Sequence, residues 1–390
     1  MKNWKVLPLM VMGACITIAS CEDSKREDVK VDPFTGFSTP DSRTATDAEL
    51  KSAVATYVDN VVIPTYQDMY NKMSALNNAV KSLSTSSTDN NVADAANAWV
   101  AARKPWEQSE AFLYGPADLN KLDPSLDSWP LDKDGIDQIL LSGNWSDAVG
   151  GDVDDREEAP ADAPQNLRGF HTAEYLLFAD GESKKISDLD ANKIGYLKAV
   201  INRMLQDTEL LLKGWTDGTG LENGAYKEAM KNPNGNYGFS NIKQSVAMML
   251  NSDNGAEGIA NEVGATKIGD PVDKWNSGDK DAGVLAVESW YSWNSLDDYT
   301  DNIRSIRNAY YGTLDGTVAT NSLCSIMKEV NPTLNTMLVN QIQETITAIN
   351  DIPHPFRNNL GATTEVKNAQ SQCAYLCTGL ALVRAKLAGE

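Results

Sequence analysis

The residues best placed to do chemistry are His171 and Glu174, in the segment LRGFHTAEYLLFADG that runs from Leu167 to Gly181. Residues spaced i and i+3 on a helix project from the same face, so this imidazole and carboxylate could bind one metal ion together. Glu174 could instead accept a hydrogen bond from His171 and set its tautomer. A buried His paired with a Glu for purely structural reasons also fits the spacing.

The histidine content excludes the common zinc-protease signatures. The 390-residue chain has two histidines, and His354 lies between two prolines in IPHPF, where we expect a loop. No H-E-x-x-H motif can be written, and Tyr175 stands where an inverted H-x-x-E-H motif needs its second histidine. Sequence order indicates no Ser/His/Asp or Cys/His catalytic set. A metal site in this chain must therefore be rich in carboxylates, which suit iron or calcium at least as well as zinc.

The charge balance excludes a further class of function. The chain has 34 Lys and Arg residues against 54 Asp and Glu residues, a formal charge of −20. Binding to nucleic acid requires clustered cations that neutralise phosphates, so we expect no nucleic-acid partner. The hydrophobic fraction of 42% is ordinary and is sufficient for a large core.

A second candidate segment is AWVAARKPWEQSEAFLYGP, from Ala98 to Pro116. One helical stripe of this segment contains Trp99, Arg103, Trp106 and Glu110. Aromatic residues on a stripe usually indicate core, but an Arg and a Glu on the same stripe must be paired or face a cleft. One interpretation is an Arg103–Glu107 ion pair on a half-exposed face. The other is a polar site lined by Arg103, Ser109 and Glu110, with Trp106 beside it.

Two acidic segments could contribute further groups. SWPLDKDGIDQIL, from Ser128 to Leu140, contains Asp132, Asp134 and Asp137, and is typical of a helix N-terminus with acidic residues in its first turn. The stretch from Val287 to Gly312 combines many aromatic residues with four charged candidates. These are Glu288, Asp297, Asp298 and Arg304. We expect this stretch to form the facing wall of a site.

The elements that must position these residues are helices, because apolar residues recur with a period of 3.6 and no strand pattern is convincing. The expected helices cover 46–82, 90–114, a short stretch within 129–140, 167–178, 187–216, 240–263, 283–311, 317–350 and 363–387. We expect a kink at Pro64, a break at Pro332, and a helix end at GATKIGDP. Residues 143–165 read as an acidic loop. The sequence predicts an all-α fold with bundle packing.

A weak internal echo predicts two related halves, at about 46–220 and 221–390. WEQSEAFLYG, from Trp106, and IRSIRNAYYG, from Ile303, both end a helix with aromatic residues before Gly. Such endings are also common helix stops, so the echo alone is a weak indication of a pseudo-repeat.

The N-terminal segment resembles a targeting signal rather than part of the fold. Two lysines and an apolar run precede Ile18-Ala19-Ser20-Cys21, which is typical of a bacterial lipoprotein signal with lipidation at Cys21. We therefore expect a signal peptide at 1–20, a flexible tether at 21–45, and one helical domain at 46–390. Three cysteines remain in that domain, Cys324, Cys373 and Cys377, and they form either one disulfide or three buried thiols.

Taken together, the segments resemble the imelysin family. The resemblance rests on RGFHTAEYLLF, which is similar to the family's G-x-H-x-x-E motif, and on WVAARKPWEQSEAFLYGP, SWPLDKDGID, ANEVGATKIGDP and DNIRSIRNAYYG in the family's order. It implies two helical bundles with the motif near their junction, in a periplasmic or surface lipoprotein often tied to iron acquisition. It also implies metal binding through His171 and Glu174, with Glu110 and Asp137 as additional candidate ligands.

The leading hypothesis is therefore a lipid-anchored protein of the cell envelope, on the periplasmic or surface side of the outer membrane. It would bind a metal ion such as iron or another divalent cation, or a small ligand that carries one, and work with envelope partners in iron uptake. A metallopeptidase is the second hypothesis, because the family was named for that activity. A non-catalytic surface interaction module is the third.

Overall fold

The computed structural model describes residues 31–150 and 164–389, and the regular secondary structure of this part is almost entirely helical. Its β-structure is a single antiparallel hairpin formed by β1 (Phe178–Ala179) and β2 (Glu182–Ser183). The predicted all-α class is confirmed. The expected signal peptide, the lipidation site Cys21 and most of the acidic loop lie outside the described residues. Among the helices of the described ranges, we find none that is long and apolar enough to cross a membrane.

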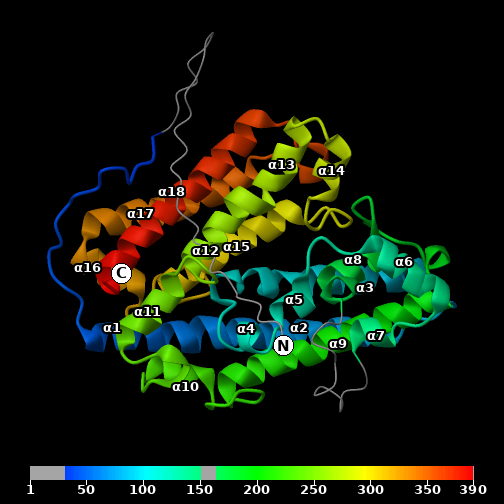
Figure 1. Ribbon diagram of the computed structural model, residues 1–390, viewed down its shortest axis with the longest axis horizontal. Helices are drawn as coiled ribbons and strands as arrows, with labels where there is room; N and C mark the ends of the chain where they lie inside the picture. Colours follow the sequence, from blue (N-terminus) through cyan, green and yellow to red (C-terminus); the bar gives the residue numbers. More distant parts are fainter. Residues whose placement is uncertain (1–30, 151–163, 390) are drawn as a thin grey trace, which may run out of the picture. The chain divides into compact units, whose positions relative to one another are not determined.

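The first group of helices, coloured blue to green in Figure 1, is built around α2, which packs against α3 and α9. The group comprises α1 (Asp47–Tyr57), α2 (Ile63–Lys81), α3 (Asp89–Glu107), α4 (Pro116–Leu119), α5 (Asp123–Asp127), α6 (Lys133–Ser142), α7 (Ser146–Val149), α8 (Phe170–Leu177), α9 (Ala191–Thr216) and α10 (Tyr226–Lys231). A capping box of Thr46 and Glu49 starts α1. Ahead of Pro64, where we expected a kink, the helix passes through a π-helical turn, η1 (Val58–Val62).

The second group runs from yellow-green to red in Figure 1, and α17 packs against both α15 and α18. It comprises α11 (Ile242–Leu250), α12 (Ala256–Asn261), the π-helical turn η7 (Glu262–Lys267), α13 (Gly269–Asn276), α14 (Lys280–Leu285), α15 (Ser295–Tyr311), α16 (Leu323–Val330), α17 (Pro332–Asn350) and α18 (Thr363–Leu387). Pro332 separates α16 from α17 as predicted. Short 3₁₀ turns fill several connections, at η2 (Glu110–Phe112), η4 (Gln165–Leu167), η5 (Ile186–Asp188), η6 (Asn236–Gly238) and η8 (Phe356–Asn358).

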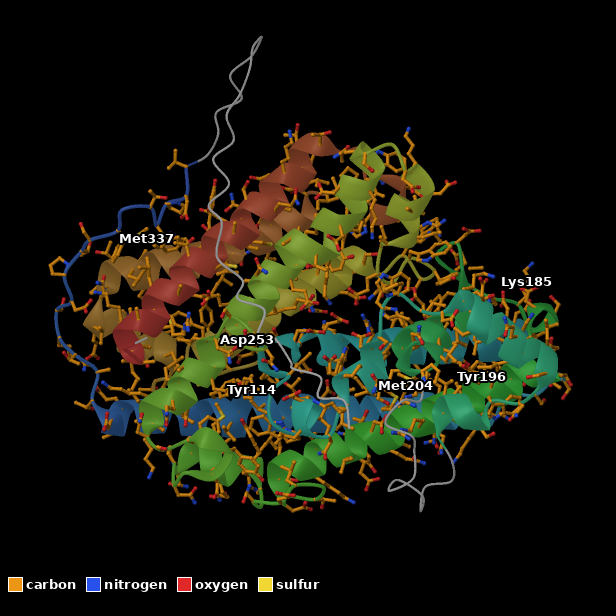
Figure 2. All side chains as sticks on the ribbon, viewed as in Figure 1. Tyr114, Lys185, Tyr196, Met204, Asp253 and Met337 are labelled. Atoms are coloured by element: carbon orange, nitrogen blue, oxygen red, sulfur yellow. The ribbon has the colours of Figure 1, made fainter. Side chains whose placement is uncertain are left out.

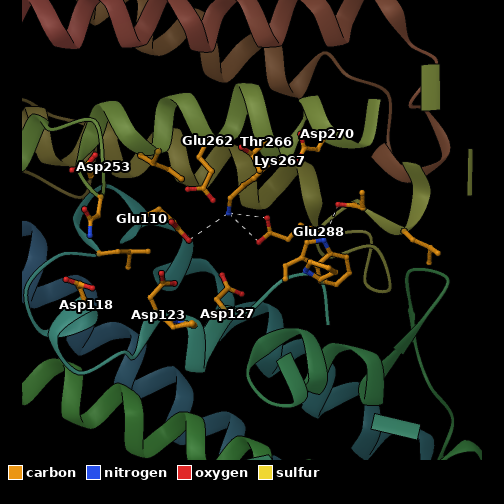
Figure 3. Close-up of a pocket in the computed structure, with 18 of the residues that line it drawn as sticks. Glu110, Asp118, Asp123, Asp127, Asp253, Glu262, Thr266, Lys267, Asp270 and Glu288 are labelled. Carbon is orange, nitrogen blue, oxygen red and sulfur yellow. Dashed lines mark hydrogen bonds and ion pairs between the residues drawn. The ribbon is translucent and has the colours of Figure 1, made fainter. Parts of the chain in front are cut away.

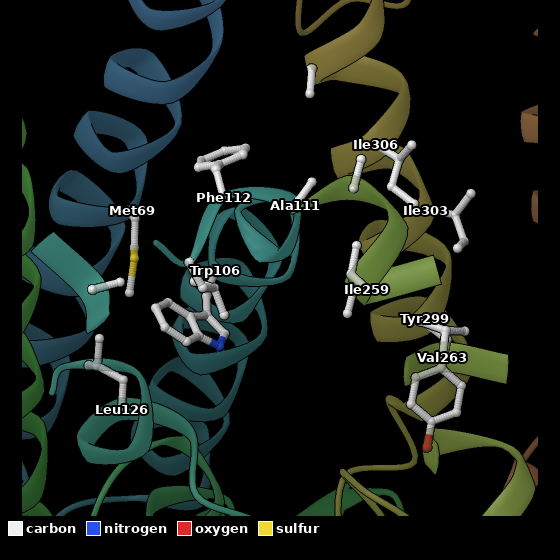
Figure 4. Close-up of a cluster of buried hydrophobic side chains, with 14 of the residues drawn as sticks. Met69, Trp106, Ala111, Phe112, Leu126, Ile259, Val263, Tyr299, Ile303 and Ile306 are labelled. Carbon is white, nitrogen blue, oxygen red and sulfur yellow. The ribbon is translucent and has the colours of Figure 1, made fainter. Parts of the chain in front are cut away.

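The hydrophobic core is continuous between the two groups. The turn η2, which follows α3, contacts α12 and α15, so that Ala111 lies between Trp106 and Phe112 on one side and Ile259 and Ile303 on the other (Figure 4). The side chains of Tyr196 and Met204, both on α9, are buried, whereas Lys185, which precedes this helix in the sequence, is exposed. All three are labelled in Figure 2.

Two helix predictions are wrong, and both errors affect the candidate site. GATKIGDP was expected to end a helix, but the chain continues there as η7 and then α13. Gly264 allows the π-helical turn to lie against α18, because a Cβ at this position would be 2.6 Å from Cβ of Cys373. The helix expected over 283–311 is broken at 286–294 by turns in which Ser289 and Trp293 have positive φ values of 53° and 63°.

The packed body begins before residue 46. The residues from Pro33 onward form one compact unit, in which Phe34 is 2% exposed and the backbone N–H of Ser42 donates to the carbonyl of Val330. Residues 33–45 therefore pack on the helices, although we expected them to belong to the tether.

The three cysteines of the helical domain are free thiols in the structure. Cys324 and Cys373 are buried, and Cys377 is half-buried. Burial raises the pKa of Cys324 to about 11 and that of Cys377 to about 12, so neither thiol is ionised near neutral pH.

Candidate metal centre

The helix that carries His171 begins where two backbones approach closely. Gly169 precedes α8 with a φ of +87°, and a Cβ there would lie 2.4 Å from the carbonyl oxygen of Leu126 in α5. Glycine alone combines this φ with so close an approach. The contact places the start of α8 against α5, so His171 lies next to Asp127, the last residue of α5.

The His171 ring is 1% exposed, and each of its nitrogens faces a carboxylate. Nδ1 lies 3.0 Å from Oε2 of Glu174, and Nε2 lies 3.1 Å from Oδ1 of Asp127 and 3.5 Å from Oε1 of Glu288. Within the described part of the chain, Nε2 makes no hydrogen bond, and its two carboxylate contacts are ion-pair contacts. The indole of Trp129 packs on the ring with centroids 4.7 Å apart. A buried ring nitrogen directed between two carboxylates fits a metal ligand.

Glu174 is placed to orient His171. Its carboxylate is fully buried, and Oε1 accepts hydrogen bonds of 2.8 Å from both the backbone N–H and the hydroxyl of Ser292. Oε2 faces Nδ1 of His171. With both oxygens engaged, Glu174 resembles the outer carboxylate that fixes the tautomer of a metal-binding histidine, rather than a free ligand.

Arg103 is fully buried at the centre of four carboxylates. Its guanidinium lies 2.6 Å from Glu107, 2.7 Å from Glu288 and 3.3 Å from Asp298, and it also contacts Asp127. The Arg103–Glu107 ion pair that we considered from the sequence is present. It is completely buried rather than half-exposed, because α15 and the turns at 286–294 cover it with further carboxylates.

Lys267, the last residue of η7, brings a second buried cation to the same place. Its Nζ lies 3.1 Å from Oε2 of Glu288, 3.9 Å from Oε1 of Glu110 and 4.0 Å from Oε2 of Glu107. We call the following residues the acidic cluster: Glu107, Glu110, Asp127, Glu174, Glu288 and Asp298. Arg103 and Lys267 are the permanent cations that contact it, so carboxylates outnumber them.

The cations lower the pKa of two members of the acidic cluster. Burial opposes ionisation of Glu288, but Lys267, His171 and Arg103 outweigh it and lower the pKa to about 2. Burial also opposes ionisation of Asp127, and Arg103 and His171 again prevail, so its pKa falls well below the ordinary value. These two carboxylates are therefore ionised at neutral pH and available as ligands.

For other members of the cluster, burial prevails. It raises the pKa of Asp298 to about 7, and it holds the pKa values of Glu107 and Glu110 well above their usual range, despite the neighbouring cations. The positive charge present is therefore insufficient to keep the whole cluster ionised.

The pKa of His171 is held well above its ordinary value. Burial and Arg103 both oppose its protonation, but Asp127 and Glu174 outweigh them. A histidine that binds a metal must be neutral, so occupation of this site would release its proton.

Two sets of atoms in this region have the spacing of metal ligands. The first set is contributed by Asp127, His171 and Glu288, and the second by Glu107, Glu110 and Asp127; in each, the ligand atoms lie within 4.8 Å of one another. The donors are one imidazole nitrogen and several carboxylate oxygens, a combination that suits iron and other cations that prefer oxygen.

A cavity of about 890 Å³ is lined by Asp127 and Glu288 of the first set and by Glu110 and Asp127 of the second (Figure 3). Eight acidic residues and three lysines line it, and the acidic residues include Glu110, Asp123, Asp127, Glu262, Asp270 and Glu288. In Figure 3, Lys267 points from η7 toward Glu110 and Glu288 across this cavity. The surplus of carboxylates favours cations inside it.

The structure brings most of the residues predicted from the sequence into one place. Five of them form one connected network of contacts: Glu174, His171, Glu288, Arg103 and Asp298, in that order. Glu110 contacts Lys267 at the cavity wall. Trp106 donates a 2.6 Å hydrogen bond from Nε1 to Oδ2 of Asp127. Ser109 is buried nearby but donates to the carbonyl of Trp106, so it makes no contact with the cluster through its hydroxyl.

Two of the predicted residues are engaged elsewhere. Asp137 accepts a 2.7 Å hydrogen bond from Tyr175 and pairs with Lys133 at 2.5 Å, with its side chain 39% exposed. It is not among the carboxylates that contact His171. Arg304 pairs with Asp301 and is 33% exposed. His354 lies in an exposed loop, as expected.

The sequence reasoning missed Asp127 and Lys267. Asp127 directly precedes the SWPLDKDGID segment, and Lys267 lies inside GATKIGDP. The sequence motifs therefore lead to the right segments but do not single out these two residues. Neither has a partner within a helical turn that would have marked it as functional; only the tertiary contacts of α5 and η7 bring them to His171 and Glu288.

The fold and the site define an all-helical protein with a buried histidine–carboxylate centre beside an acidic cavity. The family model described as Imelysin matches residues 62–383. The chain belongs to the imelysin family.

The chain is similar to three proteins of known sequence or structure. It is 27% identical to iron-regulated protein A of Synechococcus elongatus, over 78% of this chain and 77% of that protein. A crystal structure of a candidate iron-regulated protein A precursor from Parabacteroides distasonis is 50% identical, with a TM-score of 0.84, and covers 90% of this chain and 98% of that chain. An imelysin-like protein from Psychrobacter arcticum is 14% identical, with a TM-score of 0.61 over 89% of this chain and 98% of that chain, and so shares the fold.

Proposed function

We propose that this protein binds an iron ion or another divalent cation, free or carried by a small ligand, and serves iron uptake in the cell envelope. His171 Nε2, Asp127 and Glu288 are the ligands in this proposal, and Glu174 orients the imidazole. The observation that carries the proposal is the buried Nε2, which lies between two carboxylate oxygens without a hydrogen bond. A bound cation would supply positive charge where the acidic cluster lacks it.

The relatives support an iron-related role through their names, since two of them are called iron-regulated protein A or its precursor. A lipid anchor at Cys21 and contact with envelope uptake partners belong to the same proposal. Replacing Cys21 by Ser should release the protein from the membrane fraction of the cells that make it. Unchanged membrane association would contradict the anchor without affecting the metal site.

The test of the metal site is an anaerobic calorimetric titration of the chelator-treated protein with Fe²⁺. His171→Ala should weaken binding at least a hundredfold, because it removes the imidazole ligand. His354→Ala is the matched control, since it changes the other histidine in an exposed loop, and it should bind as the wild type does. Equal stoichiometry and affinity in His171→Ala and wild type would refute the ligand assignment. A lowered melting temperature as the sole effect of His171→Ala would support a structural role.

A metallopeptidase is the second candidate, favoured by the cavity. At about 890 Å³ it has the size of a small-molecule or peptide site, and it adjoins Asp127 and Glu288 at the candidate metal position. Hydrolysis would require the metal to activate a water, with a neighbouring carboxylate as general base. Cleavage of a peptide library that is sensitive to chelators and is lost in His171→Ala would establish this activity. Binding of Fe²⁺ without such cleavage would favour the first proposal.

A further inference from the structure

Glu110 is a buried carboxylate that lacks a matching partner. It is 7% exposed and lines the cavity. Among the described residues, no hydrogen bond reaches its side chain, and the cation that contacts it, Lys267, holds its Nζ 3.9 Å away, beyond hydrogen-bonding distance. Burial of a carboxylate without close partners is costly. The oxygens of Glu110 are therefore free to bind a cation that approaches more closely than Lys267 does.

The neighbours of Glu110 complete a set of ligands that does not include His171. Ligand atoms of Glu107, Glu110 and Asp127 lie within 4.8 Å of one another. Glu107 is fully buried; its Oε2 accepts a 2.5 Å hydrogen bond from Asn302, and its Oε1 lies 2.6 Å from Arg103 without hydrogen-bond geometry. All three groups offer oxygen, so this set is suited to a hard divalent or trivalent cation.

Asp127 belongs to both sets of ligands. It faces Nε2 of His171 in one and lies with Glu107 and Glu110 in the other. A carboxylate shared in this way is how proteins hold two cations a few ångströms apart. Two partners fix its position, since Trp106 donates to Oδ2 and Arg103 contacts Oδ1.

Lys267 occupies the space beside the second set. Its ammonium has three donors and pairs with Oε2 of Glu288 at 3.1 Å, but the one hydrogen bond it makes to the described residues, to Oε1 of Glu288, is long at 3.4 Å. It lies within 4.0 Å of Glu107 and Glu110 without bonding to either. This is the position of an internal counter-ion that pairs closely with Glu288 but only loosely with Glu107 and Glu110, and that could withdraw into the adjoining cavity.

We propose that Glu107, Glu110 and Asp127 form a second cation position, joined through Asp127 to the His171 position, and that Lys267 substitutes for the cation when this position is empty. The protein would then hold a pair of cations bridged by Asp127. This inference extends the proposed function, because it adds a second cation to the same centre. The all-oxygen position does not depend on His171, so the two proposals can fail separately.

Mn²⁺ is the probe for the experiment, because equilibrium dialysis counts the bound ions and paramagnetic resonance reports spin coupling between neighbouring ones. The wild type should bind two Mn²⁺ ions and give the spectrum of a coupled pair. Glu110→Gln, which keeps the side-chain shape, should bind one Mn²⁺ with an uncoupled spectrum. His171→Ala should also bind one, uncoupled. Asp270→Asn, an exposed carboxylate of the same cavity outside both sets, is the matched control and should behave as wild type.

The outcomes separate the two proposals. If Glu110→Gln binds as many Mn²⁺ ions as the wild type with the same spectrum, the second position is refuted, whatever His171→Ala does. If His171→Ala keeps the wild-type stoichiometry while Glu110→Gln loses one ion, the proposed function fails at His171 and the second position stands. Melting temperatures of all variants, measured without metal, establish that each is folded.

Lys267→Met provides an independent test with a defined sign. It keeps most of the side chain and removes the ammonium, so the second Mn²⁺ no longer has to displace a positive charge from within about 4 Å of two of its ligands. The second binding constant should rise on the order of tenfold or more. An unchanged or weaker constant would overturn the assignment of Lys267 as a substitute cation.

Discussion

Replacement of Arg103 by Met should be among the most damaging single changes in this chain. The side chain is fully buried and contacts Glu107, Asp127, Glu288 and Asp298. Met has similar length and fits an apolar space, so the loss is mainly one of charge. Removing one partner from a buried ionic network leaves the others uncompensated and typically costs about 3–5 kcal/mol. Since natural domains are stable by only about 5–15 kcal/mol, this is a large fraction of the total.

The cost should increase with pH. Asp298 has a pKa of about 7 in the folded protein against an ordinary value of 3.8, so the folded state holds this proton more tightly than the unfolded state does. Stability is therefore lost as the pH rises from about 4 to 7, and more is lost when no guanidinium offsets the new charge. Glu288 acts in the opposite sense: its lowered pKa of about 2 contributes stability that is present above pH 4.5 and would be weakened in the variant. Both effects make Arg103→Met worse at pH 8 than at pH 5.

Urea unfolding followed by circular dichroism at pH 5 and pH 8 measures the effect. A loss of about 4 kcal/mol should lower the midpoint by more than about 1 M urea. Arg304→Met is the control, because Arg304 is 33% exposed and pairs with Asp301 at the surface, where such pairs contribute about 0–1 kcal/mol. If Arg103→Met costs no more than the control, or costs the same at both pH values, the buried cluster does not depend on Arg103 as we argue.

Four further predictions concern the candidate centre. Gly169→Ala should cost at least about 2 kcal/mol in urea unfolding and should weaken Fe²⁺ binding, because of its φ of +87° and the 2.4 Å approach to a carbonyl; wild-type stability would contradict this. Asp137→Asn should leave Fe²⁺ affinity unchanged within about twofold in the same calorimetric titration, since its carboxylate is engaged outside the cluster. Glu174→Gln should weaken Fe²⁺ binding roughly 10–100-fold. Wild-type Fe²⁺ binding at pH 7 should also release a proton from His171, because its pKa is raised. Calorimetry in buffers of different ionisation enthalpy measures this release. A binding enthalpy that is the same in all buffers would contradict the prediction.

Much of the fold follows from local patterns. The last helix, predicted over 363–387, has those bounds in the structure, and the break at Pro332 lies where proline requires it. Such features depend on side-chain periodicity, caps and proline, which act within a few residues. The two failures, at 262–267 and 286–294, are of another kind. Glycines in GATKIGDP indicate a helix end locally, but contact with α18 keeps that segment helical.

The candidate site also contains residues that local patterns predict and residues that only tertiary contacts bring in. His171 and Glu174 could be predicted because one helical turn separates them, and their spacing carries the chemistry. Asp137 is a candidate only through the family resemblance, because its own segment indicates no more than a helix N-terminus with acidic residues in its first turn. Asp127 reaches His171 only because α8 begins against α5, a contact between segments about 40 residues apart that no local pattern encodes.

The departures from local preference converge on one place, which is itself an argument for function. The positive φ values of Ser289 and Trp293 bend the chain so that Glu288 faces His171, and the π-helical turn η7 ends at Lys267. Each of these features costs free energy, as does a buried cluster in which carboxylates outnumber cations. Natural chains break such rules mainly at functional sites, and here the strained turns and the excess of buried carboxylates belong to the same cluster. In this cluster, carboxylates outnumber the permanent cations Arg103 and Lys267, and the adjoining cavity is lined by eight acidic residues, a combination that favours cation binding.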